Sequence, residues 1–154
     1  AGILAGVDPT RRVWIEAESS KIGNLIIPPA LWQAMKSAPR ISISAPIKAR
    51  ADYLVSAYGD ILYDRAALQD RLTRLIVHQG HERVEQWQLM ACNGENLHLA
   101  AGLIQHHYDP SYARSRSLHA SQKMGEISAS DLSTEALLDM AKQLVELAQR
   151  ATVS

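Results

Sequence analysis

The sequence contains a single cysteine, Cys92, among its 154 residues. One cysteine excludes an internal disulfide framework and a cysteine cluster around zinc. Long apolar runs are also lacking, because none approaches the roughly 20 residues of a membrane-spanning helix. The N-terminus has no basic segment followed by a signal-type apolar core. We therefore expect no membrane association, and a reducing cytoplasm is the default location.

The sequence also lacks an excess of either charge. Lys plus Arg and Asp plus Glu are each 16, so the formal net charge is zero. This balance argues against a nucleic-acid binder held by overall charge, although a local basic patch remains open because phosphates are bound by patches. The apolar content of 47% excludes a disordered chain. The length suits one ordinary domain with a core of its own.

A phosphate-binding loop is the third absence. No G-x-x-x-x-G-K-[ST] pattern occurs, and no glycine precedes a Lys-Ser or Lys-Thr pair. The chain starts without methionine, inside the apolar stretch 1–6. We expect a fragment whose first part is missing.

The most informative stretch covers residues 13–23. Its apolar start, Val13 to Ile15, leads into Glu16, Glu18 and Ser19. This pattern predicts a strand over 13–18, with the two carboxylates on one face because side chains alternate. Ligands of open α/β sheets lie beyond the carboxyl ends of strands. The alternative is that both acids are solvated at a strand end, or paired for structural reasons.

The next segments predict a βαβ unit. Pro28 and Pro29 start a helix over 28–37, and alternating residues predict a half-buried strand over 41–46, stopped by Pro46. The two strands of the unit are expected to be parallel. A helix over 47–57 follows and carries Arg50 beside Asp52, for which a surface ion pair is the simple explanation.

Helices are predicted over 64–79, 81–92 and 95–107, each with apolar residues at three-four spacing. Gly80 and Gly94 are expected to end the first two. Asp109 and Pro110 cap and begin another helix. A short strand over 125–129 and a terminal helix capped by Ser133 complete the chain. Basic residues gather in the helical part, either as a solvated face or as an RNA-binding wall: Arg65, Arg71, Arg74, Arg83, Arg114, Arg116 and Lys123.

Two further groups have competing interpretations. Tyr108 and Tyr112 could stack on bases, or could pin their helix to the core. His78 and His81 are spaced like metal ligands, but no acid or cysteine completes a tetrahedral set in the sequence, so we expect no metal site. Cys92 is expected to be a small packed residue.

Two segments resemble the bacterial tRNA 2-selenouridine synthases. They are the run with Glu16, Glu18, Ser19, Ile22 and Gly23 followed by Pro28, and the run with Tyr108, Asp109, Pro110 and Tyr112. Both resemble parts of the C-terminal, P-loop-containing half of that family. The strand, proline and helix around Arg50 also resemble P-loop nucleotide kinases, in which such a helix leads into a helical lid.

The resemblance implies a fold and an extent for the chain. The expected class is α/β, a partial P-loop NTPase-like domain with a short parallel sheet remnant and a predominantly helical insertion. Residues 1–154 would be the C-terminal portion of that domain, with 1–57 and 123–154 as its α/β part and 58–122 as the insertion. The P-loop and a rhodanese-like domain would lie upstream. Copies could pair through exposed sheet edges.

The resemblance also implies a transferase that replaces sulfur by selenium in wobble 2-thiouridine of tRNA. Selenophosphate and geranyl diphosphate would be co-substrates, Mg²⁺ is a candidate ion, and the partner is the anticodon region of tRNA. Catalytic roles would fall on Glu16, Glu18 and Ser19. Substrate-binding roles would fall on Arg50, Arg71, Arg74, Tyr108, Asp109, Tyr112, Arg114 and Arg116. The alternatives are a non-catalytic helical module that binds RNA or protein, and a small-molecule kinase fragment.

Overall fold

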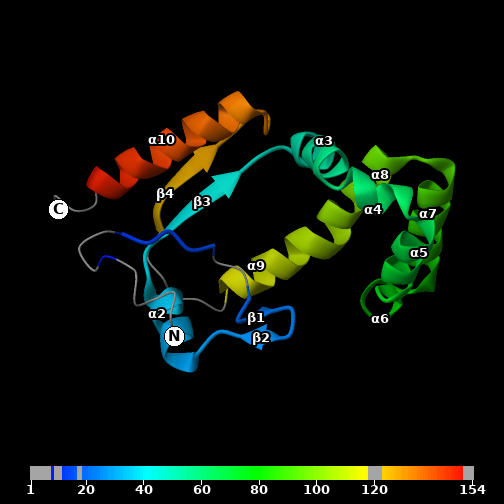
Figure 1. Ribbon diagram of the computed structural model, residues 1–154, viewed down its shortest axis with the longest axis horizontal. Helices are drawn as coiled ribbons and strands as arrows, with labels where there is room; N and C mark the ends of the chain where they lie inside the picture. Colours follow the sequence, from blue (N-terminus) through cyan, green and yellow to red (C-terminus); the bar gives the residue numbers. More distant parts are fainter. Residues whose placement is uncertain (1–7, 9–11, 17–18, 118–122, 151–154) are drawn as a thin grey trace.

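The described part of the chain consists of an α/β group and a helical group, joined where β3 (Arg40–Ser44) leads into α3 (Ile47–Ala57) (Figure 1). The computed structural model describes residues 8, 12–16, 19–117 and 123–150. The α/β group also holds α2 (Pro29–Ser37), β4 (Lys123–Ser128) and α10 (Thr134–Arg150). The architecture is therefore mixed, mostly helical, with small sheets.

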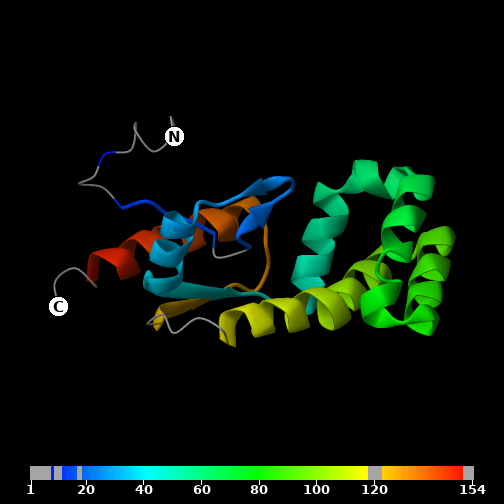
Figure 2. The same ribbon diagram turned by 90° about the horizontal axis from the view of Figure 1, so that it is seen from below.

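A two-stranded parallel sheet forms the centre of the α/β group. β3 pairs with β4, with Ile41 opposite Gly125 and Ile43 opposite Ile127. Ile127 is only 1% exposed, while α10 packs against β4. Figure 2 shows α2 and α10 on the same side of the two strands. The strand predicted over 125–129 and the half-buried strand before Pro46 are confirmed.

The strand predicted over 13–18 is wrong for the part that the structure describes. Residues 12–16 have no regular secondary structure, and Val13, Trp14 and Ile15 are 56%, 54% and 51% exposed. Apolar side chains stabilise a strand only when neighbouring strands pair with it and cover it. The parallel partner of β3 is therefore β4, and not this stretch. Residues 17–18 lie outside the described residues.

A short hairpin follows this stretch. β1 (Lys21–Ile22) and β2 (Leu25–Ile26) pair antiparallel around Gly23, whose φ is 59°. The positive φ explains the glycine, because other residues rarely adopt it. Ser19 Oγ accepts a hydrogen bond from the Lys21 amide at 3.1 Å and so fixes the entry to the hairpin.

The helical group contains the largest buried cluster. Its members come from α5 (Arg65–Thr73), α7 (His81–Asn93) and α8 (Asn96–Leu103), and they are Leu68, Leu72, Val84, Trp87, Ala91 and Leu99. Val84 and Trp87, three positions apart on α7, are 0% and 3% exposed, which agrees with the apolar spacing of the predicted helix. α4 (Gly59–Tyr63) connects α3 to this bundle. A smaller cluster of Ala51, Ala100 and Ile104 attaches α3 to α8.

The single helix predicted over 64–79 is divided into α5 and α6 (Ile76–Gln79). The Leu75 amide bonds back to Leu72 across a tighter turn, and Leu75 and Ile76 then pack on the same core as α5. The packing of these two side chains on the core explains the break between α5 and α6. The uniform spacing of apolar residues had predicted one continuous helix. Gly80, with φ 80°, and Gly94, with φ 75°, end α6 and α7 as predicted.

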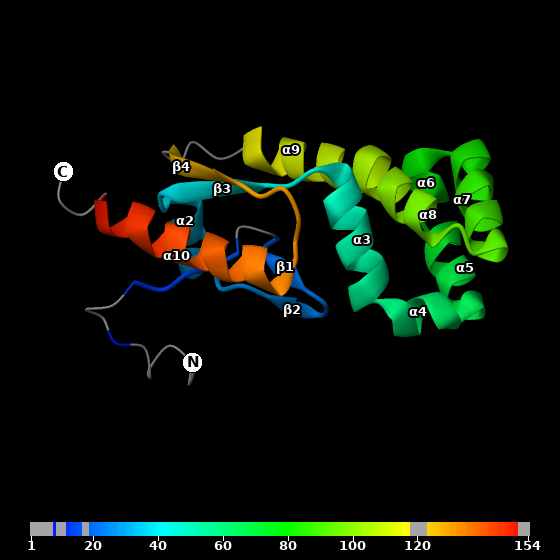
Figure 3. The same ribbon diagram turned by 90° about the horizontal axis from the view of Figure 1, so that it is seen from above.

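An α-helix begins at Asp109 as predicted, but the predicted capping role of Asp109 is wrong. α8 continues through the π-helix η1 (Ile104–Tyr108) into α9 (Asp109–Ser117), and Figure 3 shows the three following one helical path. Asp109 has helical backbone angles, and its amide donates to the Ile104 carbonyl. Its carboxylate is therefore available for a partner elsewhere in the fold.

Each end of α10 has a hydrogen bond with a side chain. The Ala136 amide donates to Ser133 Oγ at 3.2 Å, which confirms the predicted cap. At the other end, Arg12 Nη1 donates to the Ala148 carbonyl at 2.6 Å, a favourable place for a cation. Across the described residues, the structure contains no helix with the length and apolarity needed to cross a bilayer.

Candidate functional site

Arg50 and Asp109 are two predicted site residues that the fold brings together. Arg50 Nη1 and Nη2 donate to Asp109 Oδ1 and Oδ2, both at 2.7 Å, across 59 positions of sequence. Their side chains are 32% and 39% exposed. The hydrogen bonds raise the pKa of Arg50 above its usual value, while burial opposes the rise. The two-pronged pair fixes α3 against the start of α9.

This pair replaces the surface pairing that the sequence suggested. Asp52 is bound by Lys48 at 2.8 Å, one helical turn away, and does not pair with Arg50. Asp109 was expected to cap a helix, and its carboxylate instead binds Arg50. Because Asp109 already holds two guanidinium nitrogens, Arg50 in this state serves to position the helices.

The π-helix places two aromatic rings beside α6. An extra residue in a helical turn changes which side chains share a face, and such turns are frequent at functional sites. In η1, the rings of His107 and Tyr108 meet edge to face with centroids 5.1 Å apart. The His78 ring from α6 lies 6.4 Å from the His107 ring. Residues from two distant segments thus form one surface.

The surroundings of His107 disfavour its protonation. Burial is the largest cause that lowers its pKa, followed by the charges of His78 and Arg114. Gln79 Nε2 lies 3.4 Å from His107 Nδ1, and an amide nitrogen can only donate. The ring nitrogen therefore accepts, and the proton of the neutral ring lies on Nε2.

The carboxyl edge of the parallel sheet forms a second polar region. Ser44 and Ser128 end β3 and β4, and their hydroxyl oxygens are 2.9 Å apart. α3 begins directly beyond this edge, after Pro46, and has no side-chain cap among its contacts. Ligands of α/β sheets bind at such edges.

The remaining predicted site residues are dispersed. Glu16 is exposed on the stretch without regular structure, and Ser19 serves the hairpin. Arg74 pairs with Asp70 at 2.6 Å, and Arg71 is exposed on α5. Tyr108, Tyr112 and Arg114 lie together on η1 and α9. Arg116 belongs to α9, and Glu18 lies outside the described residues.

Gln79 is a contact residue that the sequence reasoning missed. It bridges Arg83, whose Nη1 donates to Gln79 Oε1 at 3.2 Å, and His107. A usable signal was present, because His78 and Gln79 end one predicted helix and His107 ends another. Within the described residues, no three His, Cys, Asp or Glu side chains gather closely enough to hold a metal ion.

Comparison with known proteins points to one class. The family model described as the tRNA 2-selenouridine synthase AAA domain matches residues 5–71. A tRNA 2-selenouridine synthase of Chromohalobacter salexigens is 41% identical over 49 residues, which are 32% of this chain and 14% of that protein. The chain is thus compared with a small part of a longer protein. No solved structure matches it.

These matches support the resemblance to the synthases and locate it. The matched range contains β1, β2, α2, β3, α3, α4 and most of α5. It includes Glu16, Glu18, Ser19 and Arg50, whereas the surface around His107 lies beyond it.

Proposed function

We propose that this chain is part of a tRNA 2-selenouridine synthase and contributes to tRNA modification. The observation that carries the proposal is the match of the AAA-domain model to residues 5–71. The parallel pair β3–β4, with α10 packed on β4, is compatible with the edge of a P-loop-type sheet. In this proposal the chain is the C-terminal portion of that domain, and 58–122 form its helical insertion.

The proposed reaction would first transfer the geranyl group of geranyl diphosphate to the sulfur of wobble 2-thiouridine, with release of diphosphate. Selenophosphate would then displace the geranylated sulfur as geranylthiol, and transfer of the phosphoryl group to water would leave 2-selenouridine and phosphate. Glu16, Glu18 and Ser19 would act near the reacting groups, and the helical group would contact the anticodon region. Glu16 is exposed, so its carboxylate is open to a ligand. Mg²⁺ would need only one or two carboxylates together with phosphate groups of the substrate.

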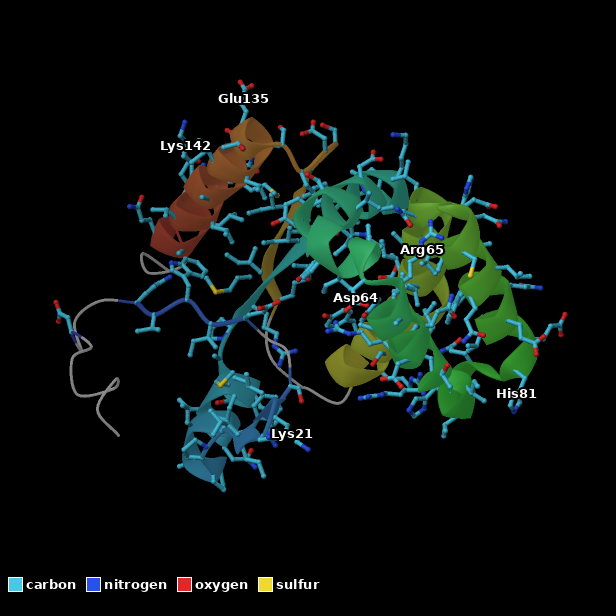
Figure 4. All side chains as sticks on the ribbon, turned by 45° about the vertical axis from the view of Figure 1, so that its right-hand side comes forward. Lys21, Asp64, Arg65, His81, Glu135 and Lys142 are labelled. Carbon is cyan, nitrogen blue, oxygen red and sulfur yellow. The ribbon has the colours of Figure 1, made fainter. Side chains whose placement is uncertain are left out.

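A complementation experiment tests this function. The complete gene that encodes the chain is expressed in cells that lack 2-selenouridine, and tRNA nucleosides are measured by mass spectrometry. We expect 2-selenouridine to appear, and Glu18→Ala to reduce it at least tenfold. Glu135→Ala, an exposed carboxylate on α10, is the matched control (Figure 4). Absence of 2-selenouridine with the intact gene would refute the proposal.

The 154-residue chain alone is expected to be inactive. It lacks a G-x-x-x-x-G-K-[ST] loop to bind a phosphate group. Incubation with thiolated tRNA and selenophosphate should give no 2-selenouridine. Turnover by this chain would show that the transfer needs no such loop.

A non-catalytic helical module remains the second candidate. The observation that favours it is that the largest buried cluster lies mainly in α7 and α8, beyond the matched residues. This candidate predicts a salt-dependent tRNA gel shift that Glu18→Ala leaves unchanged, together with no 2-selenouridine in the complementation experiment.

A further inference from the structure

The surface at the π-helix combines imidazole, phenol and guanidinium side chains. We call it the His107 cluster and define it as His78, Gln79, His107, Tyr108 and Arg114. α6 contributes the first two, η1 the next two and α9 the last. We propose that the His107 cluster binds single-stranded RNA, with Tyr108 stacking on a base and Arg114 and His78 facing phosphate.

Cationic side chains lie close to His107. Burial is the largest cause that lowers the pKa of His107, and the positive charges of His78 and Arg114 lower it further. Burial penalises any charge, but the neighbouring positive charge also attracts an anion. The nearby carboxylate of Asp109 does not offset this, because both of its oxygens are bound by Arg50.

The His107 cluster offers hydrogen-bond donors to a ligand. Gln79 occupies Nδ1 of His107, so Nε2 carries the proton of the neutral ring. The Arg114 guanidinium is exposed, and its Nε donates to the Pro110 carbonyl at 3.2 Å, which orients it along α9. Imidazole and guanidinium donors suit phosphate oxygens.

The exposed aromatic rings of the cluster favour RNA over other anionic partners. Tyr108 is 45% exposed although it touches His107, and Tyr112, one turn along, is 40% exposed. Exposed rings beside cationic groups are the combination that binds unstacked bases, whereas an acidic peptide needs no ring faces. Arg83, which donates to Gln79, and His81 line an adjoining depression that extends the surface, although Glu82 lines it too.

This inference rests on the proposed function for the identity of the RNA, but its test does not. The 154-residue chain is titrated into a fluorescein-labelled single-stranded oligouridylate of roughly 12 nucleotides, and anisotropy gives Kd. Between about 50 and 200 mM salt we expect binding to weaken markedly. Tyr108→Ala should raise Kd about fivefold or more, and Arg114→Ala should reduce the salt slope by about one.

Lys142→Ala is the matched control, since Lys142 is exposed on α10, far from His81 and the helical group (Figure 4). Circular dichroism checks folding, and His78→Gln provides a second surface variant that keeps a polar side chain. No binding by the unchanged chain, or equal Kd for Tyr108→Ala, His78→Gln and Lys142→Ala, would overturn the inference.

Competition separates the possible partners. Polyglutamate that displaces the oligonucleotide as well as unlabelled RNA does would also overturn the inference, in favour of an acidic protein. Oligonucleotide binding through the His107 cluster, with no 2-selenouridine in the complementation experiment, would refute the proposed function alone. The converse result would refute only the inference.

Discussion

Arg50 and Asp109 are the residues on which the junction of α3 and α9 depends. Asp109→Asn leaves the guanidinium without its carboxylate, so we expect a loss of about 1 kcal/mol of unfolding free energy, limited by the water that reaches both side chains. Urea titration measures this loss. The loss should be shared with Arg50→Ala in a double-mutant cycle.

The pair Lys48–Asp52 offers the control. It has a similar distance, 2.8 Å, but the Lys48 side chain is 87% exposed. Asp52→Asn should therefore cost less than about 0.5 kcal/mol. Equal losses at Asp52 and Asp109 would show that the bidentate geometry adds nothing.

His107 gives the fold a pH dependence of defined sign. Its pKa is lower in the folded protein than the ordinary 6.5, so the unfolded chain binds more protons below that value. The contribution of His107 to stability should be constant above about pH 6.5 and should fall as the pH drops towards the lower folded pKa. Urea midpoints between these conditions measure the fall, and His107→Gln should reduce it. A midpoint profile unchanged by His107→Gln would contradict the assignment.

At the scale of elements, α7 and α8 approach closely at Gly102. A Cβ there would lie 2.8 Å from Trp87 Nε1, and Trp87 is 3% exposed and enclosed by the core. Gly102→Ala should therefore cost about 1–3 kcal/mol, despite the better helix propensity of alanine. Thermal unfolding followed by tryptophan fluorescence measures the loss.

Gly125→Ala is the comparison for this prediction. Its Cβ would meet Leu147 Cδ1 at 3.1 Å, the flexible end of a side chain that can rotate away. We expect a smaller loss than at Gly102. If Gly125→Ala is the more damaging change, the packing of α10 on β4 is tighter than that of α7 on α8.

Elements with strong local signals were predictable. Proline at the start of α2 and α3, glycine at the end of α6 and α7, and Ser133 before α10 act through groups within a turn of themselves. The apolar spacing of Val84 and Trp87 predicted the buried face of α7, whereas the third inward residue, Met90 or Ala91, was left open.

Features that depend on residues far apart in the sequence were not predictable. The apolar run from Val13 to Ile15 predicted a strand. Whether such a run forms a strand depends on a neighbouring strand that pairs with it. Core packing produces both the bend after α5 and the π-helix. Such packing leaves no periodic pattern in the sequence from which either feature could be predicted. The Arg50–Asp109 pair joins residues 59 positions apart, and local spacing cannot reveal it. For the candidate site, the types of residue were therefore predictable from the sequence, but which of them come into contact was not.

For the whole molecule, the two groups of elements should differ in local stability. Six residues form the buried cluster of α5, α7 and α8, whereas β3 contains no buried residue. Amide exchange protection follows burial and cooperative packing. We expect amides of α7 to exchange more slowly than those of β3, as measured by hydrogen exchange and mass spectrometry. Slower exchange in β3 would mean that further contacts protect its edge.

The division into an α/β part and a helical insertion, and the pairing of copies through sheet edges, stay predictions. Size-exclusion chromatography with light scattering tests the pairing. The structural reason to expect it is that each of the two described sheets has two strands, so every strand in them is an edge strand.

The parallel pairing of β3 with β4 has a consequence for biosynthesis. Ser44 and Ser128, which meet at the ends of these strands, are 84 positions apart in the chain. The ribosome must therefore synthesise all the helices between them before β3 can pair with β4. Early formation of those helices shortens the span that must close and lowers its entropic cost. Until then the nascent strand is open to foreign chains, so its protection during translation depends on how quickly the intervening bundle forms.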